Sequence, residues 1–233
     1  MELLTTQNAK TVKGEKRRWH TGIMYLAPGR VAGGPNVCPH ADAGCQASCL
    51  FTAGRGRMDK IKKARIRKTQ ALFKDRKSFI ASLDTDINRI QAAARRKGMR
   101  AAVRLNGTSD LPWHTAAYGK IMCRNPDVMH YDYTKDPKRM RARRPDNYHL
   151  TFSRGVNNDR ICKTLLKEGH NVAVVFDKVP VGKKFWGYPV IDGDLDDLRF
   201  LDKSPCIIGL KAKGKARQDT TGFVVKTAEA IKE

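Results

Sequence analysis

The chain has 233 residues, of which 40% are hydrophobic and 30% are charged. This is enough apolar sequence for one domain with a sizeable core, and it argues against wholesale disorder. The 46 Lys and Arg against 23 Asp and Glu give a formal net charge of +23 at pH 7. No apolar run approaches the roughly 20 residues of a membrane span, and no signal peptide is visible. We therefore expect a cytoplasmic protein without a membrane partner.

Seven short apolar, β-branched or aromatic runs are predicted to be strands, and helical patterns separate most of them. Residues 1–16 are expected to be a mobile basic arm. Strands and helices in alternation imply parallel strands with right-handed crossovers. The expected fold is therefore α/β: a partial or closed (β/α) barrel of about six to seven parallel strands, forming a single TIM-barrel-like domain over residues 17–233. The expected strands are residues 22–27, 101–106, 128–133, 148–153, 172–177, 188–192 and 206–211.

A long helical region is predicted between the first two strands. Its second half repeats apolar residues at three- and four-residue steps, and Gly98 is expected to end it. The repeated residues are Ile80, Leu83, Ile87, Ile90 and Ala94. Shorter helical patterns cover residues 113–124, 136–143 and 158–168.

The positive charge is concentrated in three clusters. Residues 54–100 hold 16 Lys or Arg and four Asp, and the other clusters are residues 135–144 and 211–217. Such clustering favours a nucleic-acid partner, DNA or RNA, over a surface tuned only for solubility. The residues expected to contact phosphates are Arg55, Arg57, Lys60, Lys62, Lys63, Arg65, Arg67, Lys68, Lys138, Arg139, Arg141, Arg143 and Arg144.

Three cysteines, Cys38, Cys45 and Cys49, share one short loop after the first expected strand. Thiolates gathered in such a loop indicate a metal, because one ion or cluster can hold together a loop that has no core. Three ligands leave one coordination position open, which favours a catalytic centre over a closed structural zinc site. The alternative is zinc, with His40 completing a Cys3His site. A third possibility is that the three thiols only pack.

The other three cysteines, Cys123, Cys162 and Cys206, are expected to be small core residues rather than ligands or disulfide partners. The tryptophans Trp19, Trp113 and Trp186 are likewise expected to pack. For Trp113, stacking on an adenine or a flipped base is an alternative.

Polar residues follow most of the expected strands, where ligands bind in barrels and in open parallel sheets. The cysteine loop follows the first strand, so we expect it at the same rim. The acidic side chains also permit an enzyme that does not use the cysteine loop for chemistry, either a divalent-metal nuclease or a base-exchanging transglycosylase. The candidate catalytic residues are Asp110, Asp132, Lys135, Asp192 and Asp194.

Four segments resemble those of a phage and plasmid family, the gene product 88 family. They read LNGTSDLPW at residues 105–113, YDYTK at 131–135, LTFSR at 150–154 and VIDGD at 190–194. The resemblance extends from about residue 10 to the end of the chain. It implies no activity by itself. If the protein is phage-encoded, its location is the host cytoplasm, and a phage or host protein partner is possible.

The order of cysteine loop, Gly-x-Ser-Asp-like turn and Thr-Lys-x-Pro turn is similar to that of the phage three-Cys-motif proteins, which resemble radical S-adenosylmethionine (SAM) enzymes. This similarity implies a partial (β/α) barrel and a [4Fe–4S] cluster on the three cysteines, with SAM at the open iron. The spacing here, C-x6-C-x3-C, departs from the common C-x3-C-x2-C. The similarity matches residues 106–110 to the place where such enzymes bind the SAM amino group, and the strand-end rule adds further residues to the same cavity. The expected cofactor-binding residues are Asn106, Gly107, Thr108, Ser109, Ser153, Arg154, Lys211 and Lys213.

Three functions follow from these observations. The first is a radical-SAM-like enzyme that modifies DNA, RNA or a nucleotide. The second is a non-radical nucleic-acid enzyme that uses the strand-end aspartates. The third is a zinc-stapled DNA- or RNA-binding protein.

Overall fold

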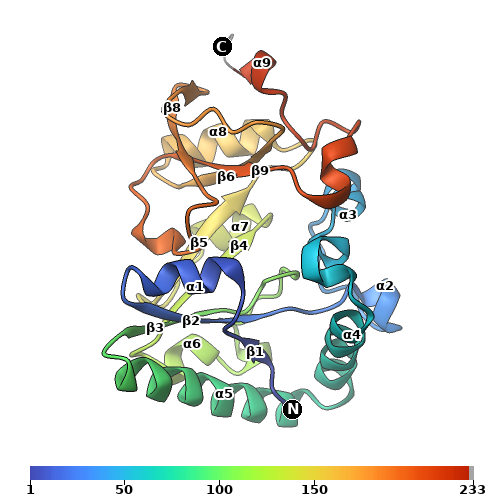
Figure 1. Ribbon diagram of the computed structural model, residues 1–233, viewed down its shortest axis with the longest axis vertical. Coiled ribbons are helices and arrows are strands. Elements are labelled where there is room, and N and C mark those ends of the chain that lie inside the picture. Colours follow the sequence, from blue (N-terminus) through green and yellow to red (C-terminus); the bar gives the residue numbers. More distant parts are fainter. Residues whose placement is uncertain (231–233) are drawn as a thin grey trace. The chain divides into compact units, whose positions relative to one another are not determined.

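The computed structural model describes residues 1–230, with side chains for all of these except residue 229. In this part of the chain, nine strands form one sheet in the order β1-β2-β3-β4-β5-β6-β9-β8-β7 (Figure 1). The pairs β2–β3, β3–β4, β5–β6, β6–β9 and β8–β9 are parallel, whereas β1–β2 and β7–β8 are antiparallel. The α/β class with mostly parallel strands is confirmed. The sheet is open, because its order ends at β1 and β7, so the closed form of the expected barrel is wrong.

All seven expected strands are present, with ends that differ by up to three residues from the expected ones. The structure adds β1 and β7, which have two residues each and are too short to leave a pattern in the sequence. The strands are β1 Leu4–Thr5, β2 Trp19–Met24, β3 Arg100–Arg104, β4 Met129–Thr134, β5 Tyr148–Ser153, β6 Val172–Phe176, β7 Lys184–Phe185, β8 Tyr188–Asp192 and β9 Ile207–Lys211.

The long helical region is two helices, α4 and α5. Asp75 separates them: its side chain accepts a hydrogen bond from Ser78 N (3.0 Å) and so begins α5. The expected apolar stripe is the buried face of α5, and Gly98 follows the helix with φ of 60°. The helices are α1 Ala9–Glu15, α2 Gly29–Ala32, α3 Ala43–Ala47, α4 Asp59–Lys74, α5 Arg76–Arg96, α6 Ile121–Arg124, α7 Pro137–Arg141, α8 Asp159–Lys167 and α9 Thr227–Ala230.

The helical pattern over residues 113–124 gives only a 3-10 turn, Ala116–Tyr118, and the short α6. Two successive residues between them, Gly119 and Lys120, have left-handed backbone conformations with φ of 71° and 48°. A right-handed helix cannot pass through such a pair, so the expected single helix is interrupted there.

Contacts divide the chain into two compact units. In the first unit, α5 packs along β2 and β3, and α1 packs on β2 (Figure 1). In the second unit, α8 packs on β6. The expectation of a single domain over residues 17–233 stays a prediction. The first unit comprises residues 1–39, 58–132 and 142–150, and the second comprises residues 40–57, 133–141 and 151–233.

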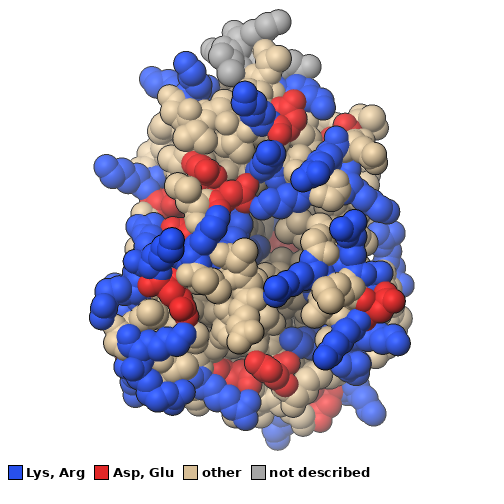
Figure 2. Space-filling view, in the orientation of Figure 1, with Lys and Arg blue, Asp and Glu red and all other residues tan. Residues whose placement is uncertain are grey.

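The surface is rich in positive charge. On the face drawn in Figure 2, Lys and Arg side chains are spread over most of the area, with few Asp and Glu side chains between them. Of the helices in the described residues, none combines the length and the apolar composition that a membrane crossing requires.

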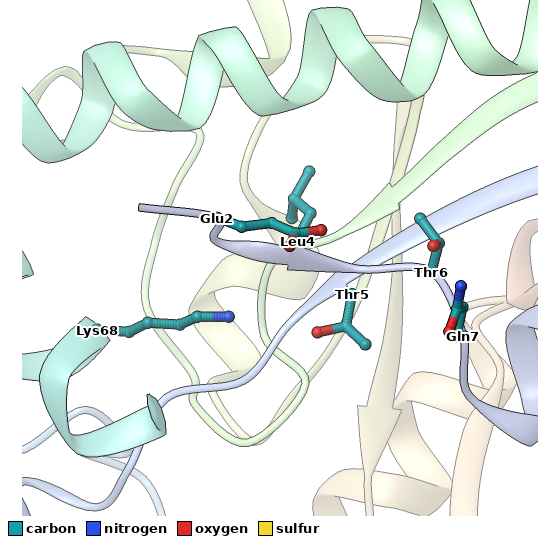
Figure 3. Close-up of a pocket in the computed structure, with 6 residues that line it drawn as sticks. All are labelled: Glu2, Leu4, Thr5, Thr6, Gln7 and Lys68. Atoms are coloured by element: carbon teal, nitrogen blue, oxygen red, sulfur yellow. The ribbon is translucent and has the colours of Figure 1, made fainter. Parts of the chain in front are cut away.

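The first residues do not form the expected mobile arm, because buried polar groups anchor them. Asp86 of α5 accepts hydrogen bonds from Leu3 N (2.5 Å) and Leu4 N (3.3 Å), and Lys68 of α4 donates to Leu3 O (2.7 Å). Figure 3 shows Lys68 extending toward β1, where it lines a pocket of about 280 Å³ with strand residues. Burial lowers the pKa of the Lys68 amine. Leu3 and Leu4 are buried, so this strand is part of the core.

Candidate functional site

The turn after β3 in the first unit is organised around the side chain of Asn106. Its Oδ1 accepts hydrogen bonds from Ser109 Oγ (2.8 Å), Leu111 N (2.9 Å) and Trp113 Nε1 (3.1 Å). Its Nδ2 donates to Leu111 O (2.9 Å). Asn106 is only 2% exposed, so its polar atoms hold the turn together rather than face solvent.

The same turn is pinned to the chain that follows β2. Gly107 N donates to Met24 O (3.0 Å), and Thr108 Oγ1 donates to Leu26 O (2.6 Å). A Cβ at Gly107 would lie 2.5 Å from Met24 O, so only glycine permits this approach. Cys38 lies against the turn, since its Sγ is 3.7 Å from Thr108 O. The first unit therefore brings Cys38 together with the predicted residues of the Asn106–Asp110 segment.

Asp132, near the end of β4, is fully buried and belongs to this network. Its Oδ1 accepts from Asn106 N (2.6 Å), and its Oδ2 accepts from Tyr148 Oη (3.0 Å). A buried carboxylate is stabilised by such donors. Both of its oxygens therefore have a structural task. The catalytic role expected for Asp132 stays a prediction, as does that of Asp110, whose N donates to Val37 O (2.8 Å).

Trp113 is fully buried and packs against Phe79 and Tyr118, with ring centroids 6.4 and 4.9 Å away. The expected packing role is confirmed. Because the ring has no exposed face in this structure, stacking of a base on Trp113 does not fit.

In the second unit, Cys45 lies on α3 and Cys49 follows the end of that helix; we call residues 42–49 the cysteine turn. Asp42 begins α3: its Oδ1 accepts from Cys45 N (2.7 Å). The helical bonding continues past α3, since Ser48 N donates to Gly44 O (3.0 Å). Cys49 lies beyond the helix, with a ψ of 129°, and its Sγ accepts a hydrogen bond from Phe51 N (3.5 Å) at the start of the 3-10 turn Leu50–Thr52.

Asp42 also attaches this turn to the carboxyl end of β5. Its second oxygen, Oδ2, accepts from Val156 N (3.2 Å) in the loop between β5 and α8. A Cβ at the neighbouring Gly155 would clash with the same carboxylate. The cysteine turn therefore lies where the sequence predicted a ligand site, at the carboxyl ends of parallel strands.

A C-terminal segment, residues 219–225, also packs against the cysteine turn. A Cβ at Gly44 would lie 2.5 Å from Thr221 Oγ1 and 2.6 Å from Phe223 Cβ. Asp219 shapes this segment by accepting hydrogen bonds from Thr221 Oγ1 (2.6 Å) and Val224 N (2.9 Å). We call residues 219–225 the strap.

Lys135 and Arg154 hold the strap and the β5 loop in place. Lys135 Nζ donates to Arg154 O (3.0 Å) and lies 5.4 Å from the ring centroid of Phe223. Arg154 Nη1 donates to Gly222 O (2.8 Å), and its guanidinium pairs with Asp159 (2.7 Å). Their expected catalytic and cofactor-binding roles, like that of Ser153 beside them, stay predictions.

At the ends of β8 and β9, the structure brings four predicted residues together. Asp194 N donates to Asp192 Oδ1 (2.8 Å), and Lys211 N donates to Asp194 Oδ2 (3.0 Å). Lys213 Nζ forms an ion pair with Asp194 Oδ1 (2.6 Å). Asp194 thus joins two neighbouring loops through both of its oxygens.

The candidate metal ligands are divided between the two compact units. Cys45 and Cys49 belong to the second unit, whereas Cys38 belongs to the first unit. His40, the alternative zinc ligand, lies 3.6 Å from Asp136. Across the described residues, no group of three or more His, Cys, Asp or Glu side chains is arranged to hold a metal ion. The metal centre therefore stays a prediction.

The remaining cysteines are mostly as expected. Cys162 and Cys206 are buried, and burial raises the pKa of each thiol to about 12. Both are inert core residues. Cys123 is exposed at the end of α6, so its expected core position is wrong.

The predicted phosphate-binding residues divide by exposure. Lys68 and Arg139 are only 9% and 6% exposed, too little for the surface contacts expected of them. Arg65 is half-buried over the ring of Tyr25, and Arg141 pairs with Glu168 at 2.8 Å. The exposed members are Arg55, Arg57, Lys60, Lys63, Arg67, Lys138, Arg141 and Arg143, while Lys62 and Arg144 are half-buried.

Sequence reasoning missed three residues that build the cysteine turn: Asp42, Gly44 and Asp219. A usable signal existed for Asp42, because an Asp directly before a short helical stretch is a typical N-cap. Gly44 and Asp219 act through a contact between segments distant in the sequence, which no local pattern reveals.

An open, mostly parallel α/β sheet with a cysteine-bearing turn at the carboxyl ends of its strands is the class that this fold and site define. Within that class, the chain belongs to the gene product 88 family, whose model matches residues 2–227. No match was found among curated proteins or among solved structures.

Proposed function

We propose that the protein binds nucleic acid and that its cysteine loop holds a metal centre, radical-SAM-like in type, which modifies the bound DNA, RNA or nucleotide. The observation that carries the metal part is the cysteine turn. Asp42 holds the backbone of Cys45 and joins it to the loop after β5, and Cys49 follows the end of the same short helix. In the other unit, Cys38 lies against the turn after β3.

The iron–sulfur form is supported by the number of thiolates in the loop. A [4Fe–4S] cluster on three cysteines would leave one iron open, and there it would supply the binding of SAM and its cleavage with one electron from an external donor. In this proposal the open sheet is a partial (β/α) barrel. The protein's own part is to hold the thiolates through Asp42 and to exclude water with the strap.

The nucleic-acid part is supported by the charge and by one face of α4. Lys60, Lys63 and Arg67 are exposed and spaced three and four residues apart, so they form one basic ridge along the helix. A ridge of this kind fits a phosphate backbone. The negative charges of the phosphates would offset part of the net charge of +23. The location that goes with such a partner is cytoplasmic.

The metal proposal is tested by analysing anaerobically purified protein for iron, sulfide and zinc. We expect a brown protein that contains iron, and Cys45→Ala should lose the metal. Cys123→Ala removes an exposed thiol outside the loop and is the matched control, which should keep it. Retention of all the iron in single variants of Cys38, Cys45 and Cys49 would contradict the proposal.

Zinc is the second outcome of this experiment, and one observation bears on it. His40 belongs to the same unit as Cys45 and Cys49, and 3.6 Å separates it from Asp136. A colourless protein with one tightly bound zinc, lost in His40→Ala, would replace the radical chemistry with a zinc-stapled nucleic-acid-binding protein.

The nucleic-acid proposal is tested by the salt dependence of binding to a DNA duplex. Removing the three charges of the α4 ridge by Gln substitution should reduce the slope of log K against log salt by about 2.7, since each lost phosphate contact accounts for about 0.9. The control replaces Lys13, Lys16 and Arg17, which lie outside the three clusters. Equal losses in both triple variants would show a general charge effect and no site on α4.

A further inference from the structure

The hairpin of β7 and β8 carries an aromatic side chain in a conformation that costs stability. Lys184 pairs with Pro189 and Phe185 with Tyr188, which leaves Trp186 and Gly187 as a two-residue turn. Both turn residues have left-handed backbones, with φ of 54° and 80°. Such turns favour Asn-Gly, because a bulky side chain is strained at positive φ. A Trp in this place suggests a task that the turn itself does not require.

Phe185 supports the Trp186 ring from one side. The two rings stack at 24° with centroids 4.3 Å apart, and Phe185 packs edge-on against the buried Phe176 at 5.5 Å. Phe185 is 5% exposed, whereas Trp186 is only half-buried. The indole is therefore a rigid plate fixed to the core through Phe185 at the tip of the hairpin.

A lysine ammonium lies over the ring of Trp186 in this structure. Lys163 of α8 places its Nζ 5.2 Å from the ring centroid. Because Phe185 covers one face of the indole, the ammonium lies toward the other face. A contact between an exposed ammonium and a ring is weaker than the stacking of a nucleobase on an aromatic side chain, so a base can displace it.

The surroundings of this plate are basic. Lys183 and Lys184 precede it and are exposed, and residues 178–189 contain no Asp or Glu. On α8, Arg160, Lys163 and Lys167 are exposed and recur at three- and four-residue steps, so they share the face that approaches the hairpin. An aromatic plate among basic side chains is the combination with which proteins bind unpaired nucleotides.

We propose that the hairpin tip is a binding site for single-stranded nucleic acid, in which one unpaired base stacks on Trp186 in place of Lys163. The displaced ammonium then pairs with the adjacent phosphate, and Lys183 and Lys184 contact the backbone on the other side. This inference rests on the proposed nucleic-acid binding and deepens it, because it requires an unpaired base.

The test compares a fluorescein-labelled 12-nucleotide single-stranded DNA with the duplex of the same sequence. The variant is Trp186→Asn, which removes the ring and installs the residue that the turn prefers. Single-strand affinity should fall roughly 5- to 150-fold, the range for one base stack of about 1–3 kcal/mol, while duplex affinity stays unchanged. Trp186→Phe retains an aromatic face and should restore much of the affinity, and circular dichroism checks the fold of each variant.

Lys163→Ala gives a second measurement. It should leave the base stack in place and reduce the single-strand salt slope by about 0.7, the loss of one phosphate contact. Wild-type single-strand affinity in Trp186→Asn, or equal losses for single strand and duplex, would overturn the hairpin site and leave the proposed nucleic-acid binding intact. If the wild-type protein binds neither DNA at low salt, both proposals fall.

Discussion

The turn after β3 and the cysteine turn are both rich in polar residues at the carboxyl ends of parallel strands, yet they use those residues differently. In the first, the side-chain oxygen of Asn106 accepts hydrogen bonds from three donors of its own turn. In the second, the Asp42 carboxylate holds the backbone of Cys45 and of Val156, and the Cys49 sulfur accepts a single hydrogen bond from Phe51 N (3.5 Å).

The two turns therefore differ in which side chain stabilises them: the first is held by a side chain of its own, and the second by a neighbouring carboxylate. A polar side chain whose atoms are all engaged inside the protein cannot bind a ligand without loss of stability. Asn106 and Asp132 are of that kind. Where a neighbouring carboxylate holds the backbone of a turn, the shape of that turn does not depend on its own side chains, and Asp42 provides this arrangement at Cys45. The supporting role of Asn106 makes the first prediction the largest in effect.

Asn106→Ala should destabilise the protein by at least about 3 kcal/mol, because buried donors that lose their acceptor cost about 1–3 kcal/mol each. The donors are those of Ser109, Leu111 and Trp113. The measurement is the free energy of unfolding in urea. Ser109→Ala removes one donor together with its need for a partner, so its cost should stay near 1 kcal/mol. Equal costs in the two variants would show that Asn106 does not organise the turn.

Part of the fold was predictable because some of its strands are apolar on both faces. Runs such as those of β6 and β9 are nearly continuous in Val, Ile, Ala and Leu, which is typical of buried parallel strands. The N-terminal strand was missed because its order depends on Asp86 and Lys68, which are distant in the sequence. The hydrogen bonds of these two residues to Leu3 form only in the folded chain.

The site was predictable in position and less so in the role of each side chain. The strand-end rule located Cys38 beside the turn at Thr108, and Asp194 beside Lys213. It could not show that Asn106 and Arg154 would be engaged with their own loops, because hydrogen-bond partners are fixed only by tertiary packing. The spacing of residues in a sequence predicts which residues lie near each other, but it does not predict which polar atoms are already hydrogen-bonded.

His130 sharpens the comparison, because it is a buried polar side chain without support. It lies on the same face of β4 as Asp132, is 0% exposed, and neither ring nitrogen has a hydrogen-bond partner. Burial lowers the pKa of His130 to about 3. Below about pH 6.5 the unfolded chain binds a proton that the folded chain refuses, so stability falls with pH between about 6.5 and 3. The loss attributable to His130 should be about 2 kcal/mol at pH 5, at about 1.4 kcal/mol per pH unit.

The measurement is the free energy of unfolding at pH 7 and pH 5 for the wild type and for His130→Phe, which keeps a ring in the core and cannot titrate. The difference between the two pH values should be smaller in the variant by about 2 kcal/mol. A pH dependence unaltered by His130→Phe would mean that His130 is protonated in the folded protein.

The smallest effect tests the strap against the cysteine turn. At Gly44, inside α3, alanine should favour the helix by up to about 1 kcal/mol. Its Cβ would nevertheless lie 2.5 Å from Thr221 Oγ1 and 2.7 Å from Val156 Cγ2. Overpacking of this kind costs about 1–3 kcal/mol, so Gly44→Ala should lose about 1–2 kcal/mol net in urea unfolding. Gly34→Ala is the matched control and should be near neutral, because its Cβ would meet only Phe73 at an ordinary 3.6 Å.

If the metal proposal holds, Gly44→Ala should also release metal more readily than Gly34→Ala, since the strap then no longer presses the turn onto the loop after β5. Equal stability of the two variants would mean that the strap does not pack on Gly44, and the cysteine turn would then depend on Asp42 alone.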